Sequence, residues 1–211
     1  MALLLKAEEI KGLVSIDEAI NAVEQGFRDQ ANHPRFSLPR QRMMAGDRRI
    51  NIHSGGCVEL NVAGTFIHYE RHRYTKEDQT YAVAGKRVYM AYDSETAALL
   101  TIIVGSIPLY DFDDNDIATE TAITSAVGTK YLARQDCRVL GLYGTGRQAE
   151  RHLKVMCTLR PIEKVKVFSR SPENRKAFSV LMQSHRERRN RYGKRPAGSS
   201  GRFRLDRLRH R

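Results

Sequence analysis

The sequence predicts an α/β protein made of two parts: an N-terminal region of mixed helix and strand, then the beginning of a doubly wound parallel sheet. Three observations predict this fold class. A helical pattern follows residue 15, and strand-like segments separated by turn residues fill 35–110. A short apolar run at 139–143 then leads directly into a glycine-rich turn and a second helical pattern.

The elements of the first part are predicted by start signals and by periodicity. Ser15 and Glu18 have the spacing of a capping box, and apolar residues recur behind them at 16, 20, 23 and 27. We therefore expect a helix over about 15–30, ended by His33-Pro34. Strands are expected at 49–52, 63–69, 81–92 and 99–104, and a long helix with a face of small residues at 117–133.

Glycines mark the start of the second part. Gly144, Gly146 and Ala149 form a G-x-G-x-x-A pattern between the apolar run and the helical pattern. In that context the glycines permit a tight turn and close approach of a pyrophosphate, which the helix N-terminus would bind. The alternative is a glycine turn that binds nothing. We predict the first βαβ unit of a Rossmann domain, with a cofactor site at Gly144, Thr145, Gly146, Arg147, Gln148 and Ala149.

The next predicted strand indicates which cofactor is bound. An NAD site usually has an acidic residue at the end of this strand, where it accepts a hydrogen bond from the ribose. Here the strand ends in Ser169, Arg170 and Ser171, whose guanidinium and hydroxyls suit a 2′-phosphate. We therefore predict NADP rather than NAD. The alternative is an ordinary basic turn before Pro172.

The positive charge is concentrated at the C-terminal end. Residues 181–211 contain 11 Lys and Arg against 2 Asp and Glu, which leaves only +3 of the net charge of +12 on residues 1–180. This distribution argues against nucleic acid as the partner of the whole protein. The segment 181–211 has no strand or helix period, so we expect a disordered Arg-rich tail without a further strand. One explanation is an out-of-frame translation, and the other is a basic arm that binds nucleic acid or acidic lipid. We favour the first, because the change falls in the middle of a domain.

Several other classes are excluded by the sequence. The longest apolar stretch, 97–104, is far shorter than a membrane span of about 20 residues. Three cysteines without metal spacing favour a reducing cytoplasm. His68 and His72 have Glu70 between them, not directly after the first histidine as a zincin requires, and the acidic loop 111–116 lacks the EF-hand glycine and glutamate. We therefore expect no metal site.

The chain resembles the ornithine cyclodeaminase/mu-crystallin family over about residues 1–180. The motifs that carry this resemblance are LPRQR at 38–42, YDSET at 92–96, TAITSA at 121–126, KYLAR at 130–134 and VLGLYGTGRQA at 139–149. The resemblance implies a substrate and dimerisation domain at 1–116, a connecting helix at 117–134 and a partial Rossmann domain at 135–180, before the tail at 181–211. It also implies a homodimer formed through the N-terminal domain, and an amino- or imino-acid substrate.

The chemistry that the resemblance implies is hydride transfer at the α-carbon of an amino acid, with deamination and cyclisation to a proline-like product. Relatives are ketimine reductases or amino-acid dehydrogenases, and mu-crystallin-like members bind NADPH. Arg40 matches the family arginine that grips the substrate carboxylate, with Arg42 as second choice. The family's lysine has no counterpart near 65–67, its second arginine falls at Glu120, and its catalytic aspartate lies beyond the start of the tail. An inactive NADPH-binding remnant is therefore the alternative to an enzyme.

Overall fold

The computed structural model describes residues 2–71, 83–107, 109, 119–192 and 204–207, and the side chains within this set except at 83–84 and from 184 onward. The chain divides into two compact units, Met1–Ala118 and Thr119–Arg211. The expected strand at 81–92 lies partly outside the described residues, and the acidic loop 111–116 lies wholly outside them.

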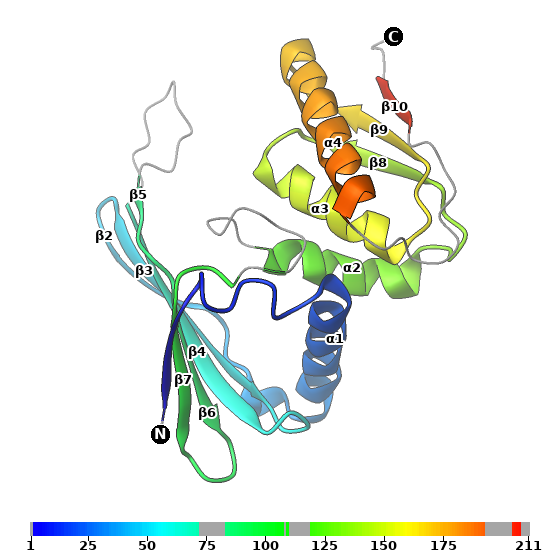
Figure 1. Cartoon of the computed structure of the whole chain (residues 1–211). Helices are drawn as coiled ribbons and strands as arrows, with labels where there is room; N and C mark the ends of the chain where they lie inside the picture. The colour runs from blue at the N-terminus through cyan, green and yellow to red at the C-terminus, as the bar shows by residue number, and fades with distance from the viewer. Residues whose placement is uncertain (1, 72–82, 108, 110–118, 193–203, 208–211) are drawn as a thin grey trace. The chain divides into compact units, whose positions relative to one another are not determined.

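The first unit is built on a largely antiparallel sheet of seven described strands (Figure 1). The order of the main path is β1, β7, β6, β4, β3, β2, and β5 pairs with β4. β1 and β7 pair in parallel, whereas the pairs from β7 to β2 are antiparallel. The strands are β1 Leu3–Lys6, β2 Gln41–Ala45, β3 Arg48–Cys57, β4 Val62–Arg71, β5 Val83–Ala84, β6 Val88–Asp93 and β7 Leu99–Val104.

The helix of this unit, α1 Ile16–Asn32, begins as its sequence predicts. The backbone N–H of Glu18 donates to Ser15 Oγ at 3.2 Å, and the Ser15 N–H donates to Glu18 Oε2 at 2.8 Å. This capping box satisfies two groups that a helix start otherwise leaves without partners. Further along, buried Asp29 accepts from the N–H groups of Val58 and Glu59, which holds the β3–β4 turn beside α1 (Figure 1). A 3₁₀ turn, Pro34–Phe36, then leads towards β2.

Strand β2 was not expected from the sequence because it lacks alternation. All five residues of β2 are exposed, and it forms the edge of the sheet. Its backbone pairs with β3 from Gln41 opposite Ile52 to Ala45 opposite Arg48. Main-chain hydrogen bonds, not burial, therefore define this strand.

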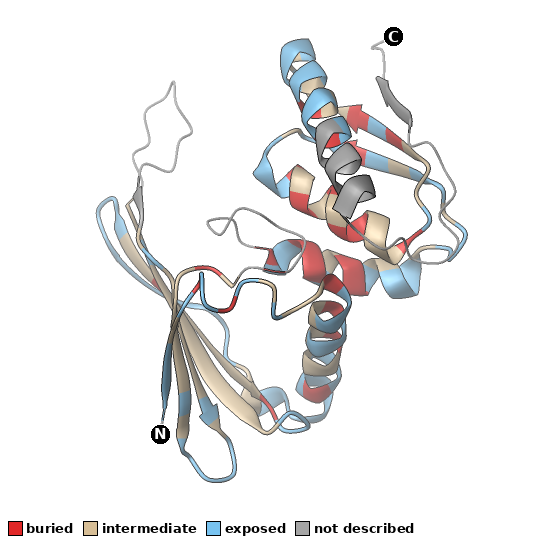
Figure 2. Cartoon of the chain, viewed as in Figure 1, coloured by how far each residue is buried: buried red, intermediate tan, exposed pale blue. Residues whose placement is uncertain are grey.

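The second unit contains α2 Glu120–Leu132, β8 Val139–Tyr143, α3 Arg147–Leu159, β9 Lys164–Phe168, α4 Pro172–Tyr192 and β10 Arg204–Arg207. β8 and β9 pair in parallel with α3 between them in sequence, which is a βαβ unit. Buried residues gather on α2, α3 and β9 (Figure 2). The apolar core between the strands and helices is formed by Leu142, Ala149, Leu153, Val165, Val167, Phe178 and Met182.

Arg160 binds the C-terminal end of α2 within this unit. Its guanidinium donates to the backbone carbonyls of Thr129, Lys130, Ala133 and Arg134 at 3.0–3.2 Å. These carbonyls lie at or just beyond the end of α2, where a helix lacks its own donors and carries the negative end of its dipole. The charge of buried Arg160 is therefore held by the end of a neighbouring helix.

The expectation for the C-terminal segment was wrong for the part that the structure describes. Helix α4 continues to Tyr192, and β10 pairs in parallel with β9, from Arg204 opposite Lys164 to Arg207 opposite Val167. Arg, Met, Gln and Glu are good helix formers, which explains the longer helix. The open edge of β9 offers backbone donors and acceptors that pair with any extended segment, whatever its side-chain pattern.

We predict that Ser15→Ala lowers the free energy of unfolding by about 1 kcal/mol, because the Glu18 N–H loses its side-chain acceptor. Urea unfolding followed by circular dichroism measures the change. Ser15→Thr retains the hydroxyl and is the matched control. Equal losses in the two variants would contradict the assignment of this stability to the cap.

Candidate functional site

The turn between β8 and α3 has the backbone that the glycine pattern predicts. Gly144 has φ of +101°, a conformation that residues with a Cβ rarely adopt. Gly146 is the N-cap of α3 with extended backbone, and the described residues contribute no side-chain hydrogen bond to this cap. A Cβ at either glycine would meet no atom within 4 Å. The turn therefore leaves space for a ligand against the N-terminus of α3.

The residues around these glycines divide by role. Ala149 is buried in the core beneath the helix, as expected for close packing of α3 on the strands. Thr145 is half-buried, and Arg147 and Gln148 are exposed on the first turn of α3. The structure therefore brings the predicted cofactor residues together on one turn, with Ala149 supporting it from below.

The end of β9 lies beside this turn. The Gly144 N–H donates to the Phe168 carbonyl at 2.7 Å, and Tyr143 is the register partner of Phe168. Because β8 and β9 are parallel, their carboxyl ends meet at one edge of the sheet. Open α/β sheets bind ligands at this edge. Ser169 and Arg170 follow Phe168 directly, so the two predicted parts of the cofactor site are adjacent.

One predicted cofactor residue is already engaged within the protein. Ser171 Oγ accepts from the Asn174 N–H at 3.0 Å, as a cap of α4, and donates to Glu173 Oε2 at 2.8 Å. The backbone N–H of Glu173 and this hydroxyl lower the pKa of the Glu173 carboxyl, which therefore stays ionised. Arg170 is exposed nearby in sequence. A cation and an anion thus flank the position predicted for a 2′-phosphate.

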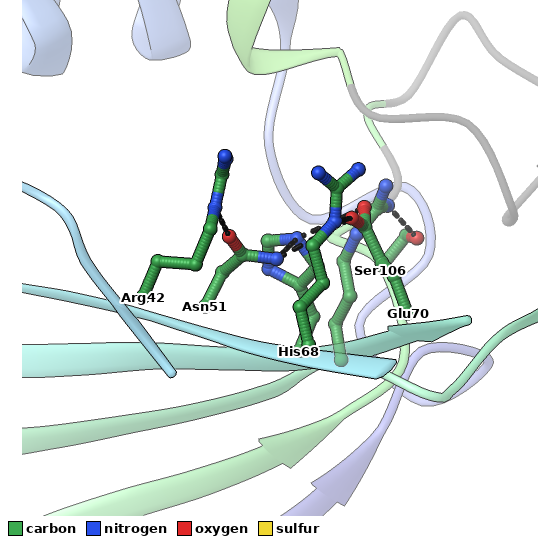
Figure 3. Close-up of polar contacts among 7 residues, drawn as sticks. Arg42, Asn51, His68, Glu70 and Ser106 are labelled. Atoms are coloured by element: carbon green, nitrogen blue, oxygen red, sulfur yellow. Dashed lines mark hydrogen bonds and ion pairs between the residues drawn. The ribbon is translucent and has the colours of Figure 1, made fainter. Parts of the chain in front are cut away.

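A second polar cluster stands on one face of the sheet in the first unit (Figure 3). The register places Arg42 opposite Asn51, Asn51 opposite His68, and Arg49 opposite Glu70. Because side chains alternate between the two faces of a strand, these five residues share one face. Figure 3 shows the side chains of Arg42, Asn51, His68 and Glu70 on the same side of the ribbon, with Ser106 beside them.

Hydrogen bonds join this cluster across three strands. Arg42 Nε donates to Asn51 Oδ1 at 2.8 Å, and Asn51 Nδ2 lies 3.1 Å from His68 Nε2. Arg49 Nε forms an ion pair with Glu70 Oε2 at 2.7 Å. His68 Nε2 also lies 3.2 Å from Glu70 Oε1. Arg87 donates to Ser106 Oγ at the far side of the cluster.

The environment of His68 favours its neutral form. Burial is the largest cause that lowers its pKa below the usual value, and the charges of Arg87 and Arg40 act in the same direction. The charge and hydrogen bond of Glu70 oppose them. Both arginines predicted to bind a carboxylate, Arg40 and Arg42, therefore act on this cluster.

Sequence reasoning missed most of this cluster. The sequence pattern predicted no role for Asn51 or Arg49. His68 and Glu70 were part of a histidine motif that does not fit a metal site, and its second histidine, His72, lies outside the described residues. The available signal was alternation: polar residues recur every second position at 49, 51 and 53 and again at 68 and 70. Within the described residues, no group of three His, Cys, Asp or Glu side chains is placed to hold a metal ion.

Glu120, which occupies the place of the family's second arginine, is the first residue of α2. An acidic residue there is favoured by the positive end of the helix dipole. Among the described helices, none is long and apolar enough to cross a membrane.

A βαβ unit with an open glycine turn at a helix N-terminus is typical of dinucleotide-binding α/β proteins. The family model for the ornithine cyclodeaminase/mu-crystallin family matches residues 1–190. The chain belongs to this family, which confirms the resemblance seen in its motifs.

Two relatives illustrate the similarity. The iminosuccinate reductase of Paracoccus denitrificans (strain Pd 1222) is 25% identical over 178 residues, 81% of this chain and 51% of that protein. Its crystal structure in complex with NAD+ has a TM-score of 0.68 and 21% identity, covering 97% of this chain and 56% of that one. The Δ1-pyrroline-2-carboxylate reductase of Thermococcus litoralis, solved with NADH and L-proline, has a TM-score of 0.68, 23% identity and coverages of 97% and 57%. The chain thus spans about half the length of these relatives.

We predict that His68 makes the stability of the protein depend on pH. The unfolded chain takes up this proton near the ordinary pKa of 6.5, before the folded protein does. The His68 contribution to the free energy of unfolding is therefore fully present above about pH 6.5 and is lost as the pH falls towards the lower, folded pKa. Urea unfolding between pH 7.5 and pH 5 measures this slope.

In this experiment His68→Gln, which has an acceptor that does not titrate, should show a smaller loss of stability on acidification than the wild type. Identical slopes in the wild type and His68→Gln would contradict the prediction.

Proposed function

We propose that the chain carries the cofactor-binding turn and the carboxylate-binding arginines of an NAD(P)H-dependent enzyme. Its reaction would be reduction of an imino acid, or the reverse oxidation of an amino acid. The observation that carries the proposal is the turn at Gly144 and Gly146, with space where a Cβ would stand and a helix N-terminus behind it. The names of the two relatives, both reductases of carboxylate-bearing imines, support it.

The cofactor would be held by the residues of this turn. The first N–H groups of α3 and its dipole suit a pyrophosphate, and Gly146 allows its close approach. Thr145, Arg147 and Gln148 surround the same position. When bound, a nicotinamide cofactor supplies the hydride that the reaction transfers. The two solved relatives contain NAD+ and NADH, which supports a nicotinamide cofactor here.

The choice between NADP and NAD depends on two charges. Arg170 is exposed directly after β9 and has the donors that a 2′-phosphate needs. Glu173, ionised beside Ser171, would repel that phosphate. We propose that Arg170 decides in favour of NADPH, because the Glu173 carboxylate already accepts hydrogen bonds from Ser171 and from its own backbone.

The carboxylate of the substrate would bind at the sheet face. Arg42 uses Nε for Asn51, which leaves its terminal N–H groups for a bidentate contact with a carboxylate. Arg40 adds positive charge at the same place. Glu70 is the acidic side chain in this cluster, and its partner is Arg49. A free amine of the substrate, as in ornithine, would have to compete with Arg49, so we favour an imino acid over a diamino acid. A homodimer formed through the first unit, as expected for the family, remains part of this proposal.

We predict that Gly146→Val weakens binding of both NADH and NADPH at least tenfold, because its side chain would occupy the ligand's space. Fluorescence titration of each cofactor measures the affinities. Gly26→Ala adds a Cβ in equally open space on α1 and is the control. Arg170→Ala should weaken NADPH alone by about tenfold, the loss of a charge-assisted hydrogen bond, and Glu173→Gln should strengthen it. Unchanged affinities in Gly146→Val would overturn the cofactor site.

We predict that the full chain oxidises NADPH in the presence of an α-keto acid and ammonia, which form an imine in solution. The panel comprises glyoxylate, pyruvate and oxaloacetate, and the decrease in absorbance of NADPH gives the rate. Arg42→Met should raise KM about tenfold, whereas Arg48→Met, on the opposite face of the sheet, should not. If the chain binds NADPH but oxidises it with none of these imines, the enzymatic function is contradicted. The chain would then be a protein that only binds the cofactor.

A further inference from the structure

Asn51 occupies the centre of the polar cluster. Its side-chain amide has an oxygen that only accepts hydrogen bonds and an NH₂ group that only donates them. The residue is 1% exposed. Its Oδ1 accepts from Arg42 Nε, while its Nδ2 donates to His68 Nε2 at 3.1 Å and reaches Glu70 Oε2 at 3.4 Å (Figure 3). Because one end of an amide only accepts and the other only donates, the groups on both sides fix which way it faces. The protonation state of His68 therefore affects the hydrogen bond that Asn51 accepts from Arg42.

This orientation requires neutral His68. Nε2 can accept from Asn51 only when it carries no proton, so the single proton of the ring is on Nδ1. Nδ1 is buried and has no hydrogen-bond partner among the described residues. In this neutral form Nε2 accepts from Asn51, and its contact with Glu70 Oε1 becomes a hydrogen bond only when Nε2 carries a proton.

Protonation of His68 reverses the pattern. Nε2–H would face the NH₂ group of Asn51, donor against donor, while Glu70 Oε1 at 3.2 Å is ready to accept. An amide that turns over would offer Oδ1 to His68, but it would then present its NH₂ group to the Nε–H of Arg42. The turn is favoured because it replaces a contact between two donors, 3.1 Å apart, by a charge-assisted hydrogen bond from Nε2–H to Oδ1. It breaks the bond that Oδ1 accepts from Arg42 Nε.

We propose that Asn51 is a positioning residue that couples Arg42 to the protonation state of His68, so that Arg42 is held for a carboxylate only while His68 is neutral. The part that concerns the carboxylate rests on the proposed function. The coupling between the two side chains does not, because it follows from the hydrogen bonds alone.

The charges around His68 determine the pH at which its ring becomes protonated. Glu70 on the same strand favours protonation, whereas Arg87, Arg40 and the burial of the ring oppose it. His53 is the remaining titratable ring in contact, with its centroid 5.8 Å from that of His68. Arg42 and Arg49 lie on the same face of the neighbouring strands, and Arg49 is paired with Glu70. We therefore expect His68 to become protonated at a lower pH than an ordinary histidine does.

A positive His68 could also attract a carboxylate directly, which would act in the opposite direction. Glu70 opposes this attraction, because its Oε1 lies 3.2 Å from Nε2 and would compensate the new charge. Loss of the bond that orients Arg42 has no such compensation. We therefore expect carboxylate affinity to fall, not rise, as His68 becomes protonated.

The test is NMR of the ¹⁵N-labelled full chain between pH 7.5 and pH 5. The ring nitrogens of His68 report the tautomer and the titration, and the Nε–H signal of Arg42 reports its hydrogen bond. We expect Nδ1–H at high pH, and loss of the Arg42 Nε–H signal by exchange with the same midpoint as His68. An Arg42 signal that is independent of the His68 titration would overturn the coupling.

Two variants keep the test decisive. In Asn51→Asp both carboxylate oxygens accept, so Arg42 should stay bonded at every pH and the pKa of His68 should rise. In His68→Gln the midpoint should disappear and Arg42 should stay bonded. Loss of the Arg42 signal at the same pH in His68→Gln as in the wild type would overturn the coupling, even if Asn51→Asp did not fold.

Succinate, used as a probe carboxylate, tests the link to binding. Its affinity, followed by the shift of the Arg42 signal, should fall about tenfold through the His68 midpoint in the wild type and stay level in His68→Gln. A higher affinity at low pH would overturn the expected direction. If succinate does not shift Arg42 while the coupling is observed, the carboxylate role in the proposed function fails and the coupling stands.

Discussion

The register between β2, β3 and β4 is the constraint on which the first unit's chemistry depends. It places Arg42, Asn51 and His68 side by side on consecutive strands, and Arg49 opposite Glu70. A slip of one residue in either pair would move these side chains to the opposite face and break the hydrogen-bonded chain. The long β3–β4 pairing, ten residues on each strand, and the buried Asp29 at its turn oppose such a slip.

In the second unit the corresponding constraint is the backbone of Gly144. Its positive φ turns the chain sharply at the end of β8, and its N–H bonds to the end of β9. Together with the parallel pairing of β8 and β9, this turn places the start of α3 and the segment after β9 at the same edge of the sheet. Arg160 performs a comparable task for α2, whose terminal carbonyls it binds. In both places hydrogen bonds to main-chain groups help to position these elements.

The two candidate sites share an electrostatic logic. Each offers donors to an anion: the start of α3 with Arg170 in one unit, and Arg42 with Arg40 in the other. Each also contains one carboxylate close to the proposed ligand, Glu173 or Glu70, that is already hydrogen-bonded within the protein. Such internal pairing limits the repulsion that these carboxylates exert on an anionic ligand. It also makes both carboxylates places where selectivity can be changed by substitution.

The sequence by itself determined the features that are local. The capping box at Ser15, the glycine turn at 144–149 and the family motifs depend on residues a few positions apart, so their pattern was enough. Only the tertiary structure decided the rest. Asn51 and His68 are 17 residues apart and become partners through strand pairing, and β10 exists because the edge of β9 was open to it. Pairing between distant strands is set by backbone hydrogen bonds and by the register of the whole sheet, which no short stretch of sequence contains.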